Sequence, residues 1–349
     1  MRRGLISRSL AELPDAALDA RIDRLRAAMA EARLDALLVY TNNTRAAGVS
    51  WLTGFVPYWS EALLMVPRAR EPVLVVALTF RVKSWIESTS RVAGVIHTPR
   101  IGLEAARLIA SAQADAAVGI ADLDGLSAGI LADLREGGPR LTLSDASALF
   151  ARLRTEADPA EIALAVKAAT IAQAALAPRP GAGLAEMTAG VEARARLLGA
   201  EEVYVAVARD LARDRRLRRI EGEATLGDDF GLRATVAYKG TWVRLVRTFT
   251  DGLPDDAAAA PFAAAVAQLP SERGFAGFSS WLVEGCRIAQ PLEPLMGSRV
   301  ADPNPPAPRA LVSVQACLEI DGRPVLLGAP ALLGGRGETA SLLVQPLSI

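Results

Sequence analysis

The sequence predicts a two-domain protein, with an α/β domain over residues 1–150 and an α+β domain over residues 151–349. Three observations favour this fold class. Strand-like and helical segments alternate up to about residue 145, a long capped helix begins near residue 158, and strands dominate after residue 200. The length of 349 residues also exceeds the size at which a single hydrophobic core usually stops growing.

The first half begins with an amphipathic helix over residues 16–34, in which apolar residues recur at helical spacing and arginines lie on the other side. Short apolar runs bounded by polar turns then predict strands at 35–41, 61–68, 71–78, 92–98 and 116–122. Helices are expected between them at 81–89, 102–113 and 124–137. This alternation indicates a mostly parallel sheet covered by helices.

The second half opens with a strong helix start, because Asp158 can cap the helix and Pro159 fits its first turn. A second helix is expected to end at Gly199. Strands are predicted at 202–208, 232–238, 241–249, 309–320 and 323–329, with a helix at 255–269 and a proline-rich loop at 301–309. Antiparallel strands with few helices indicate an α+β domain.

Composition excludes several functions. The 39 basic and 39 acidic residues balance, so no net field favours nucleic acid or a membrane surface. No apolar run is long enough to span a bilayer, and the N-terminus has no apolar signal segment. Cys286 and Cys317 form no disulfide framework, so we expect a cytoplasmic protein. The single histidine, His97, ends a predicted strand and is expected to be structural.

The stretch LRATVAYKGTWVRLVRTF, residues 232–249, predicts a β-hairpin that turns at Lys239-Gly240. Tyr238 then pairs with Thr241, and strand alternation gives one face to the following residues: Arg233, Thr235, Ala237, Trp242, Arg244 and Val246. Arg233 and Arg244 are diagonal neighbours on this face. Either it is an ordinary solvent face, or the two cations meet an anion.

At the level of motifs, the chain resembles the creatinase/aminopeptidase P/prolidase family, whose second domain has the pita-bread fold. RIDRLRAAMAEARLDALLVYTNN, WLTGF and ALLMVPR resemble the small N-terminal domain of this family. LRTEADPAEIALAVKAATIA resembles the segment that opens its catalytic domain, and LGDDFGLRATVAYKGTWVRLVRTF resembles its strand pair. The resemblance covers nearly the whole chain and implies an α/β N-terminal domain followed by an α+β pita-bread domain.

The resemblance also implies where metal ligands would lie. The two metal-binding aspartates of the family fall on Arg233 and Arg244, and a metal-binding histidine falls on Cys286. The two metal-binding glutamates fall on Gln315 and about Gly328. A dinuclear site needs anionic oxygen ligands, and two guanidiniums would repel the cations. We therefore expect no metal and no cofactor.

Two functions remain open. One is a metal-independent enzyme in which Arg233 and Arg244 bind a small anionic, amino-acid-like substrate. Glu293, near the position of the family's proton-handling histidine, would be its general acid or base, and Cys286 its nucleophile; the alternatives are an ion pair for Glu293 and simple burial for Cys286. Further substrate-binding candidates are Gln315, Tyr238 and Trp242. The reaction would be C–N hydrolysis, elimination, cyclisation or isomerisation.

The other function is an inactive relative that binds a ligand or serves as a scaffold. In either case the resemblance implies a homodimer, in which the loop after WLTGF reaches the cleft of the partner. In this chain that loop carries Tyr58 and Trp59, which we expect to close the site of the neighbouring protomer or to pack at the interface.

Overall fold

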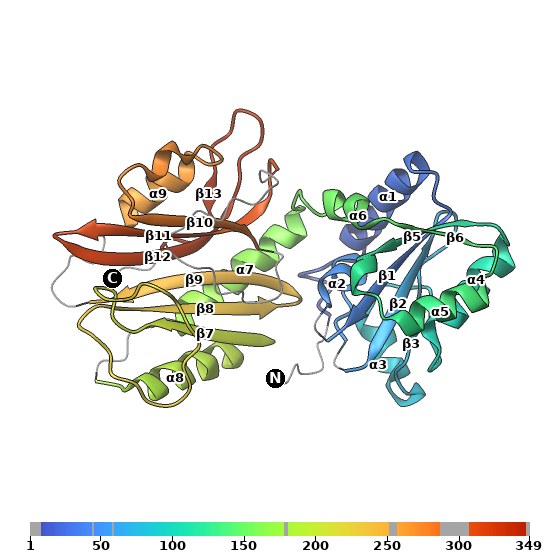
Figure 1. Ribbon diagram of the computed structural model, residues 1–349, viewed down its shortest axis with the longest axis horizontal. Helices are drawn as coiled ribbons and strands as arrows, with labels where there is room; N and C mark the ends of the chain where they lie inside the picture. The colour runs from blue at the N-terminus through green and yellow to red at the C-terminus, as the bar shows by residue number, and fades with distance from the viewer. Residues whose placement is uncertain are drawn as a thin grey trace. The chain divides into compact units, whose positions relative to one another are not determined.

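The computed structural model describes residues 8–43, 45–57, 59–177, 181–250, 257–286 and 307–346. The chain divides into two compact units between Arg154 and Thr155, and each is described by itself (Figure 1). Helices and strands follow the order that Figure 1 labels, with short 3-10 turns at Phe80–Val82, Leu123–Gly125 and Glu272–Phe275. None of the helices in these residues is long and apolar enough to cross a membrane.

A six-stranded sheet forms the centre of the N-terminal unit, in the order β4-β3-β2-β1-β5-β6. Its strands are β1 Ala36–Asn42, β2 Glu61–Pro67, β3 Val73–Val76, β4 Gly94–His97, β5 Ala117–Ala121 and β6 Thr142–Asp145. The pairs β3–β4, β1–β5 and β5–β6 are parallel, whereas β2 pairs antiparallel with both β1 and β3. The sheet is therefore mixed, because the short link from β2 to β3 permits only antiparallel pairing.

Helices cover both faces of this sheet. They are α1 Asp15–Glu31, α2 Ala47–Thr53, α3 Lys83–Thr89, α4 Ile101–Ala112, α5 Ala128–Gly137 and α6 Ser147–Leu153. Leu37 and Val39 of β1 belong to one apolar core, and Leu38 and Tyr40 belong to another. Alternate residues of the same strand thus enter opposite cores, as a sheet between two helical layers requires.

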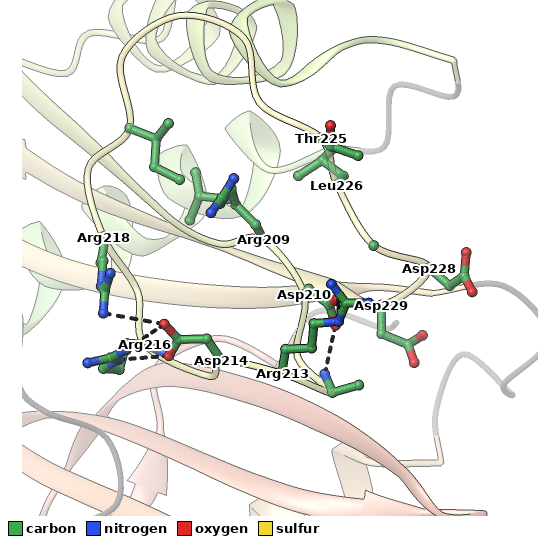
Figure 2. A pocket seen from close by; sticks show the side chains of 14 residues that line it. Arg209, Asp210, Arg213, Asp214, Arg216, Arg218, Thr225, Leu226, Asp228 and Asp229 are labelled. Carbon is green, nitrogen blue, oxygen red and sulfur yellow. Dashed lines mark hydrogen bonds and ion pairs between the residues drawn. The ribbon is translucent and has the colours of Figure 1, made fainter.

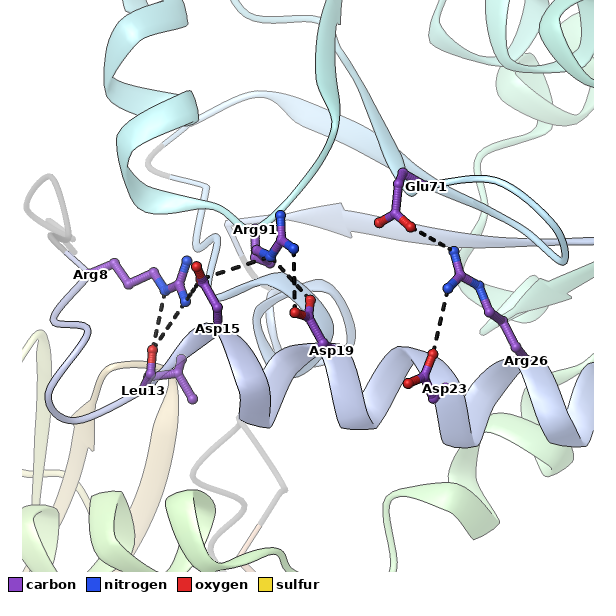
Figure 3. A network of polar contacts seen from close by, with 8 residues as sticks. All are labelled: Arg8, Leu13, Asp15, Asp19, Asp23, Arg26, Glu71 and Arg91. Carbon is purple, nitrogen blue, oxygen red and sulfur yellow. Dashed lines mark hydrogen bonds and ion pairs between the residues drawn. The ribbon is translucent and has the colours of Figure 1, made fainter.

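Ion pairs link the polar side of α1 to neighbouring segments (Figure 3). Arg91 binds Asp19 through both Nε, at 3.1 Å, and Nη2, at 3.3 Å, and its Nε lies 3.9 Å from Asp15. Further along α1, Arg26 lies 3.6 Å from Glu71. Such exposed pairs contribute at most about 1 kcal/mol each, so the apolar side of α1 supplies most of its attachment.

The C-terminal unit contains an antiparallel sheet in the order β10-β11-β12-β9-β8-β7, with β13 paired to β12 (Figure 1). Its strands are β7 Glu202–Ala208, β8 Phe230–Tyr238, β9 Thr241–Phe249, β10 Ser280–Gly285, β11 Leu311–Ile320, β12 Arg323–Leu332 and β13 Ser341–Leu342. Its helices are α7 Pro159–Ala175, α8 Leu184–Leu197 and α9 Ala259–Ala267. This is the α+β fold class that the sequence predicted.

The start of α7 follows the predicted capping pattern. The Asp158 side chain accepts a hydrogen bond from the Glu161 backbone N–H at 2.9 Å, and Pro159 occupies the first turn. At its other end, the carbonyl of Leu176 accepts a hydrogen bond from Arg247 on β9 at 3.2 Å. Arg247 lies opposite Leu232, so α7 packs on the sheet face that carries Leu232, and the face with Arg233 is the other one.

Candidate functional site on the arginine face

The β8–β9 hairpin has the predicted register. Lys239 and Gly240 both have positive φ, at 48° and 77°, as the tight two-residue turn requires. Tyr238 pairs with Thr241, and Thr235 pairs with Arg244. The Glu201 carboxylate accepts hydrogen bonds from the backbone N–H groups of Lys239 at 2.5 Å and Gly240 at 3.0 Å, which fixes the turn.

The face that carries Arg233 and Arg244 is buried. Arg233 is 1% exposed and Arg244 is 0% exposed, and both are among the largest fully buried side chains. This excludes the interpretation of the arginine face as an ordinary solvent face. Burying a guanidinium costs free energy unless charge and hydrogen bonds compensate it, so the neighbours of the two arginines decide what the site can do.

Strand pairing identifies those neighbours. Gln315 lies opposite Gly328, Gly328 opposite Val246, and Val246 opposite Arg233, so these four residues form one rung across β11, β12, β9 and β8. Residues that lie directly opposite share a face of the sheet, with Cβ atoms roughly 4.5–5.5 Å apart.

A second set of residues lies one step along the strands. Thr235 lies opposite Arg244, and Ser313 lies opposite Glu284. Thr235, Arg244 and Ser313 are each two positions along their strand from a residue of the first rung, so they point to the same face. Glu284 shares this face because it lies directly opposite Ser313. We call the following residues the arginine cluster: Arg233, Thr235, Arg244, Glu284, Ser313 and Gln315.

Glu284 supplies the negative charge beside Arg244. Its Oε1 lies 3.0 Å from Arg244 Nε, and its side chain is 11% exposed. The two atoms are not aligned as a hydrogen bond, so the contact is electrostatic. In a buried site such a pair offsets part of the desolvation cost of both groups.

Three neutral side chains of the cluster are buried and have no hydrogen-bond partner among the described residues. They are the Thr235 hydroxyl, the Ser313 hydroxyl and the Gln315 carboxamide, for which this holds at both the oxygen and the nitrogen. Thr235 is 1% exposed, and Ser313 and Gln315 are fully buried. A buried polar group without a partner costs about 1–3 kcal/mol, and such groups are rare in folded proteins unless they serve a function.

Gly328 is closely surrounded. A Cβ atom at this position would lie 2.7 Å from Val246 Cγ2 and 3.0 Å from Gln315 Cγ, which is too close for ordinary packing. The side chains of Val246 and Gln315 therefore occupy the space that a carboxylate from position 328 would need.

Part of the arginine face is covered by the segment between β7 and β8, residues 209–229. Leu211 and Leu217 from this segment form an apolar cluster with sheet residues that include Ala206 and Val246. Beside this cluster is a cavity of about 670 Å³, which Figure 2 shows.

Arginines and aspartates line the walls of this cavity, and they form ion pairs with one another. Asp214 lies 2.8 Å from Arg216 Nε and 3.3 Å from Arg218, and Asp210 lies 3.3 Å from Arg213 (Figure 2). Hydrogen bonds from Arg216 lower the pKa of Asp214 to about 2. None of the predicted site residues that the structure describes lines this cavity.

Two further titratable groups lie at the margin of the face. Burial raises the pKa of the Cys317 thiol and outweighs its contacts with Ser279 and Arg215, so this cysteine stays protonated. At Asp229 burial also opposes ionisation, but hydrogen bonds from Arg323 and Thr250 outweigh it and lower the pKa of Asp229.

The other predicted site residues lie in different places. Trp242 is on the arginine face and stacks on Tyr204, with ring centroids 5.7 Å apart. The position of Tyr238 differs from the prediction that it binds substrate beside the arginines. Strand alternation places it on the opposite face, where a Cβ at Gly199 would lie 3.4 Å from its ring. It therefore lies away from the cluster. Cys286 follows β10 and is 2% exposed, while Trp59 is 38% exposed. Glu293 and Tyr58 lie outside the described residues.

The sequence interpretation missed Glu284, Ser313 and Thr235 as site residues. The alternation in SWLVEG and LVSVQACLEI could have indicated that Glu284 and Ser313 share a face with Gln315. The contact of Glu284 with Arg244, and the position of Ser313 near both, depend on pairings between strands that are far apart in sequence.

The residues at the metal positions implied by the resemblance do not fit a metal centre. They are Arg233, Arg244, Cys286, Gln315 and Gly328, of which only the cysteine can give an anionic donor. Within the described ranges, no three histidine, cysteine, aspartate or glutamate side chains lie close enough to hold a metal.

The fold defines a two-domain protein of pita-bread architecture. The chain superposes on X-Pro aminopeptidase from Thermotoga maritima MSB8 with a TM-score of 0.71 and 15% identity, over 94% of this chain and 98% of that one. It matches Xaa-Pro dipeptidase from Bacillus anthracis with a TM-score of 0.67 and 18% identity, over 93% and 97%. No curated protein matches the sequence.

A third solved structure has a different description. The N-terminal domain of FACT complex subunit SPT16 from Cicer arietinum (chickpea) matches with a TM-score of 0.61 and 13% identity, over 94% of this chain and 96% of that one. Residues 21–155 match the family described as Creatinase/Prolidase N-terminal domain. The resemblance seen in the sequence is thus confirmed, with the prolidase fold extending over most of the chain.

Proposed function

We propose that the C-terminal unit binds a small, anionic, amino-acid-like molecule at the arginine cluster and transforms it without a metal ion. The observation that carries this proposal is the burial of Arg233 and Arg244 on one face, beside neutral polar groups that have no hydrogen-bond partner in the described part of the chain. A guanidinium presents paired N–H donors that match a carboxylate, and two of them in a dry site bind it strongly.

Glu284 gives the site a way to handle protons. A ligand carboxylate that binds Arg244 competes with Glu284, which lies 3.0 Å from the same guanidinium. Once separated from Arg244, the Glu284 carboxylate lies beside the bound ligand, where it can accept or donate a proton during the reaction. Glu284 therefore joins Glu293 as a candidate general acid or base, for C–N hydrolysis, elimination, cyclisation or isomerisation.

Cys286 remains the candidate nucleophile. It lies two residues beyond Glu284, and its backbone N–H donates to the Leu311 carbonyl at 3.1 Å, which holds it at the end of β10. Because it is buried, a thiolate at this position needs a neighbouring cation. Loss of turnover in Cys286→Ser with binding retained would support the role, and unchanged turnover would exclude it.

Binding can be tested by thermal shift with a panel of small carboxylates. We expect at least one carboxylate to raise the Tm of the wild type, and this effect to disappear in Arg233→Met and Arg244→Met. Arg213→Met is the matched control, because that side chain is 88% exposed. If no carboxylate stabilises the wild type, or if Arg213→Met also loses the effect, the proposed site is wrong.

Metal independence is tested by elemental analysis of protein purified without chelator. We expect transition metals far below one per chain, and unchanged ligand binding after dialysis against EDTA. A stoichiometric metal that EDTA removes together with ligand binding would contradict the proposal.

Catalysis is tested separately, by incubating each binding carboxylate with the protein and following its NMR spectrum. Conversion that persists in EDTA and stops in Arg244→Met supports the enzyme. Binding without any conversion favours the second candidate, an inactive relative that binds a ligand or serves as a scaffold.

One observation favours that second candidate. Glu284 already balances the charge of Arg244 within the protein, so this arginine has a structural role without any ligand. The fold also occurs in a subunit of the FACT complex, as the match to the SPT16 domain illustrates. A scaffold would keep its fold when all three neutral cluster residues are replaced, and would show no response to carboxylates.

The proposed dimer can be checked through Trp59. Its side chain is 38% exposed, which is high for a tryptophan and suits contact with a second protomer. Light scattering should show a dimer for the wild type and a larger monomer fraction for Trp59→Ala. A wild type that is monomeric at micromolar concentration would rule out this interface.

A further inference from the structure

The neutral half of the arginine cluster points to a more specific ligand. Thr235, Ser313 and Gln315 lie on the same face as the two arginines, and each has a buried polar group that no described residue satisfies. An apolar residue of similar shape at these positions would avoid the desolvation cost. Groups that a protein leaves unsatisfied in its interior are therefore best explained by a ligand that satisfies them.

The placement of these groups is asymmetric. Gln315 shares a rung with Arg233, with Val246 and Gly328 between them. Thr235 is directly opposite Arg244, and Ser313 is directly opposite Glu284. The cluster thus has both arginines and Thr235 on β8 and β9, whereas Ser313 and Gln315 are on β11.

The chemistry of the three neutral groups is also mixed. A carboxamide has both a donor and an acceptor, and each hydroxyl can act as either. A second carboxylate would satisfy only donors and would lie near Glu284, which repels it. A carboxamide or hydroxyl on the ligand satisfies both kinds of group without adding charge.

We infer that the site takes a monocarboxylate that carries a neutral hydrogen-bonding group, a carboxamide or a hydroxyl, a few bonds from the carboxylate. This inference rests on the proposed function, because the carboxylate itself is assigned to the arginines. The neutral group binds Gln315, Ser313 and Thr235, and it distinguishes the ligand from a simple fatty acid of the same shape.

Two matched pairs of probes test this inference by calorimetry. Succinamate and 4-methylpentanoate differ only in a carboxamide against an isopropyl group, and lactate and isobutyrate differ only in a hydroxyl against a methyl group. In at least one pair we expect the polar member to bind about tenfold tighter or more, because a partnerless buried group loses its hydrogen bond with the apolar member.

Gln315→Met should remove the preference for succinamate while keeping binding of 4-methylpentanoate. Gln268→Met is the control, since Gln268 is exposed just after α9. Equal binding of both members of each pair overturns this inference but leaves the proposed function intact. Failure of every carboxylate to bind overturns both.

A measurement without ligand gives an independent test. If the groups are truly unsatisfied, Thr235→Val and Gln315→Met should raise the Tm of the free protein by about 2–4 °C, because each removes a desolvation cost. Thr170→Val is the control, because Thr170 is exposed and donates to the Val166 carbonyl at 2.9 Å. A fall in Tm for both cluster variants would mean that the groups are satisfied internally, for instance by trapped water, and would overturn the inference.

Discussion

Arg244 and Glu284 form an ion pair across the sheet of the C-terminal unit, with Arg244 Nε 3.0 Å from Glu284 Oε1. The two residues are 40 positions apart in the sequence and come from β9 and β10, which are not neighbours in the sheet. The pair therefore connects strands that share no backbone hydrogen bonds. Because both side chains are buried, the removal of either charge is expected to destabilise the fold.

Removing the carboxylate from this pair should destabilise the protein. Glu284→Gln leaves the buried Arg244 charge without this counter-charge, and such changes typically cost about 3–5 kcal/mol. Chemical denaturation measures the loss. Glu319→Gln is the matched control, because Glu319 pairs with Arg215 at 2.6 Å on an exposed part of β11, and we expect it to cost at most about 1 kcal/mol. Equal effects of the two substitutions would contradict a buried pair.

Substitution of Gly328 should be poorly tolerated. The added methyl group of Gly328→Ala would lie 2.7 Å from Val246 Cγ2, and overpacking of this kind costs about 1–3 kcal/mol. Gly231→Ala in β8 is the control, because its Cβ would lie 3.5 Å from the nearest atom, an ordinary contact.

The double variant Gly328→Ala/Val246→Ala tests the cause of that loss. If the clash with Val246 is responsible, the two substitutions together should cost less than the sum of the two measured singly. Strict additivity would mean that another neighbour is responsible.

Asp229 should make stability depend on pH in the acid range. Its pKa in the folded protein is lower than in the unfolded chain, because hydrogen bonds from Arg323 and Thr250 outweigh burial. Its contribution is therefore complete above the ordinary carboxylate pKa of about 4 and is lost as the pH falls through the lower folded pKa. Melting curves between these limits should show a weaker pH dependence for Asp229→Asn. Parallel curves for both proteins would refute the assignment.

The turn of the central hairpin should depend on Glu201. Its carboxylate accepts backbone hydrogen bonds from Lys239 and Gly240, so Glu201→Ala should cost about 1.5–3 kcal/mol, the usual value for bonds to a charged group. Glu201→Gln keeps one acceptor oxygen and should cost less. Unchanged stability in Glu201→Ala would show that the turn does not need this acceptor.

Local features of the fold were predictable from the sequence where a single segment carried all the information. The hairpin follows from strand alternation around Lys239-Gly240, and the start of α7 follows from Asp158 and Pro159. The helix α2, Ala47–Thr53, was missed because it follows the turn-like NNTRAAG without a side-chain cap. Strand β10 was missed because it is short and has few apolar residues facing one way.

The site was predictable only in part, for a physical reason. Alternation placed Arg233 and Arg244 on one face, but it could not tell whether that face was wet or buried. Its burial depends on packing that the local pattern does not encode, such as Leu211 and Leu217 against the sheet. The partners of the arginines are equally non-local, because Glu284 and Gln315 reach this face through the order of the strands.

The crowding around Gly328 has a consequence for attempts to engineer a metal-dependent enzyme from this scaffold. Installing a glutamate at this position alone would force it against Val246 and Gln315 before any cation could bind. The resemblance implies metal ligands at these positions, but the side-chain volumes around Gly328 leave no room for a carboxylate. A designer would have to reduce Val246, exchange Gln315 and remove both guanidiniums in the same construction, so no single substitution offers a gradual route to metal catalysis.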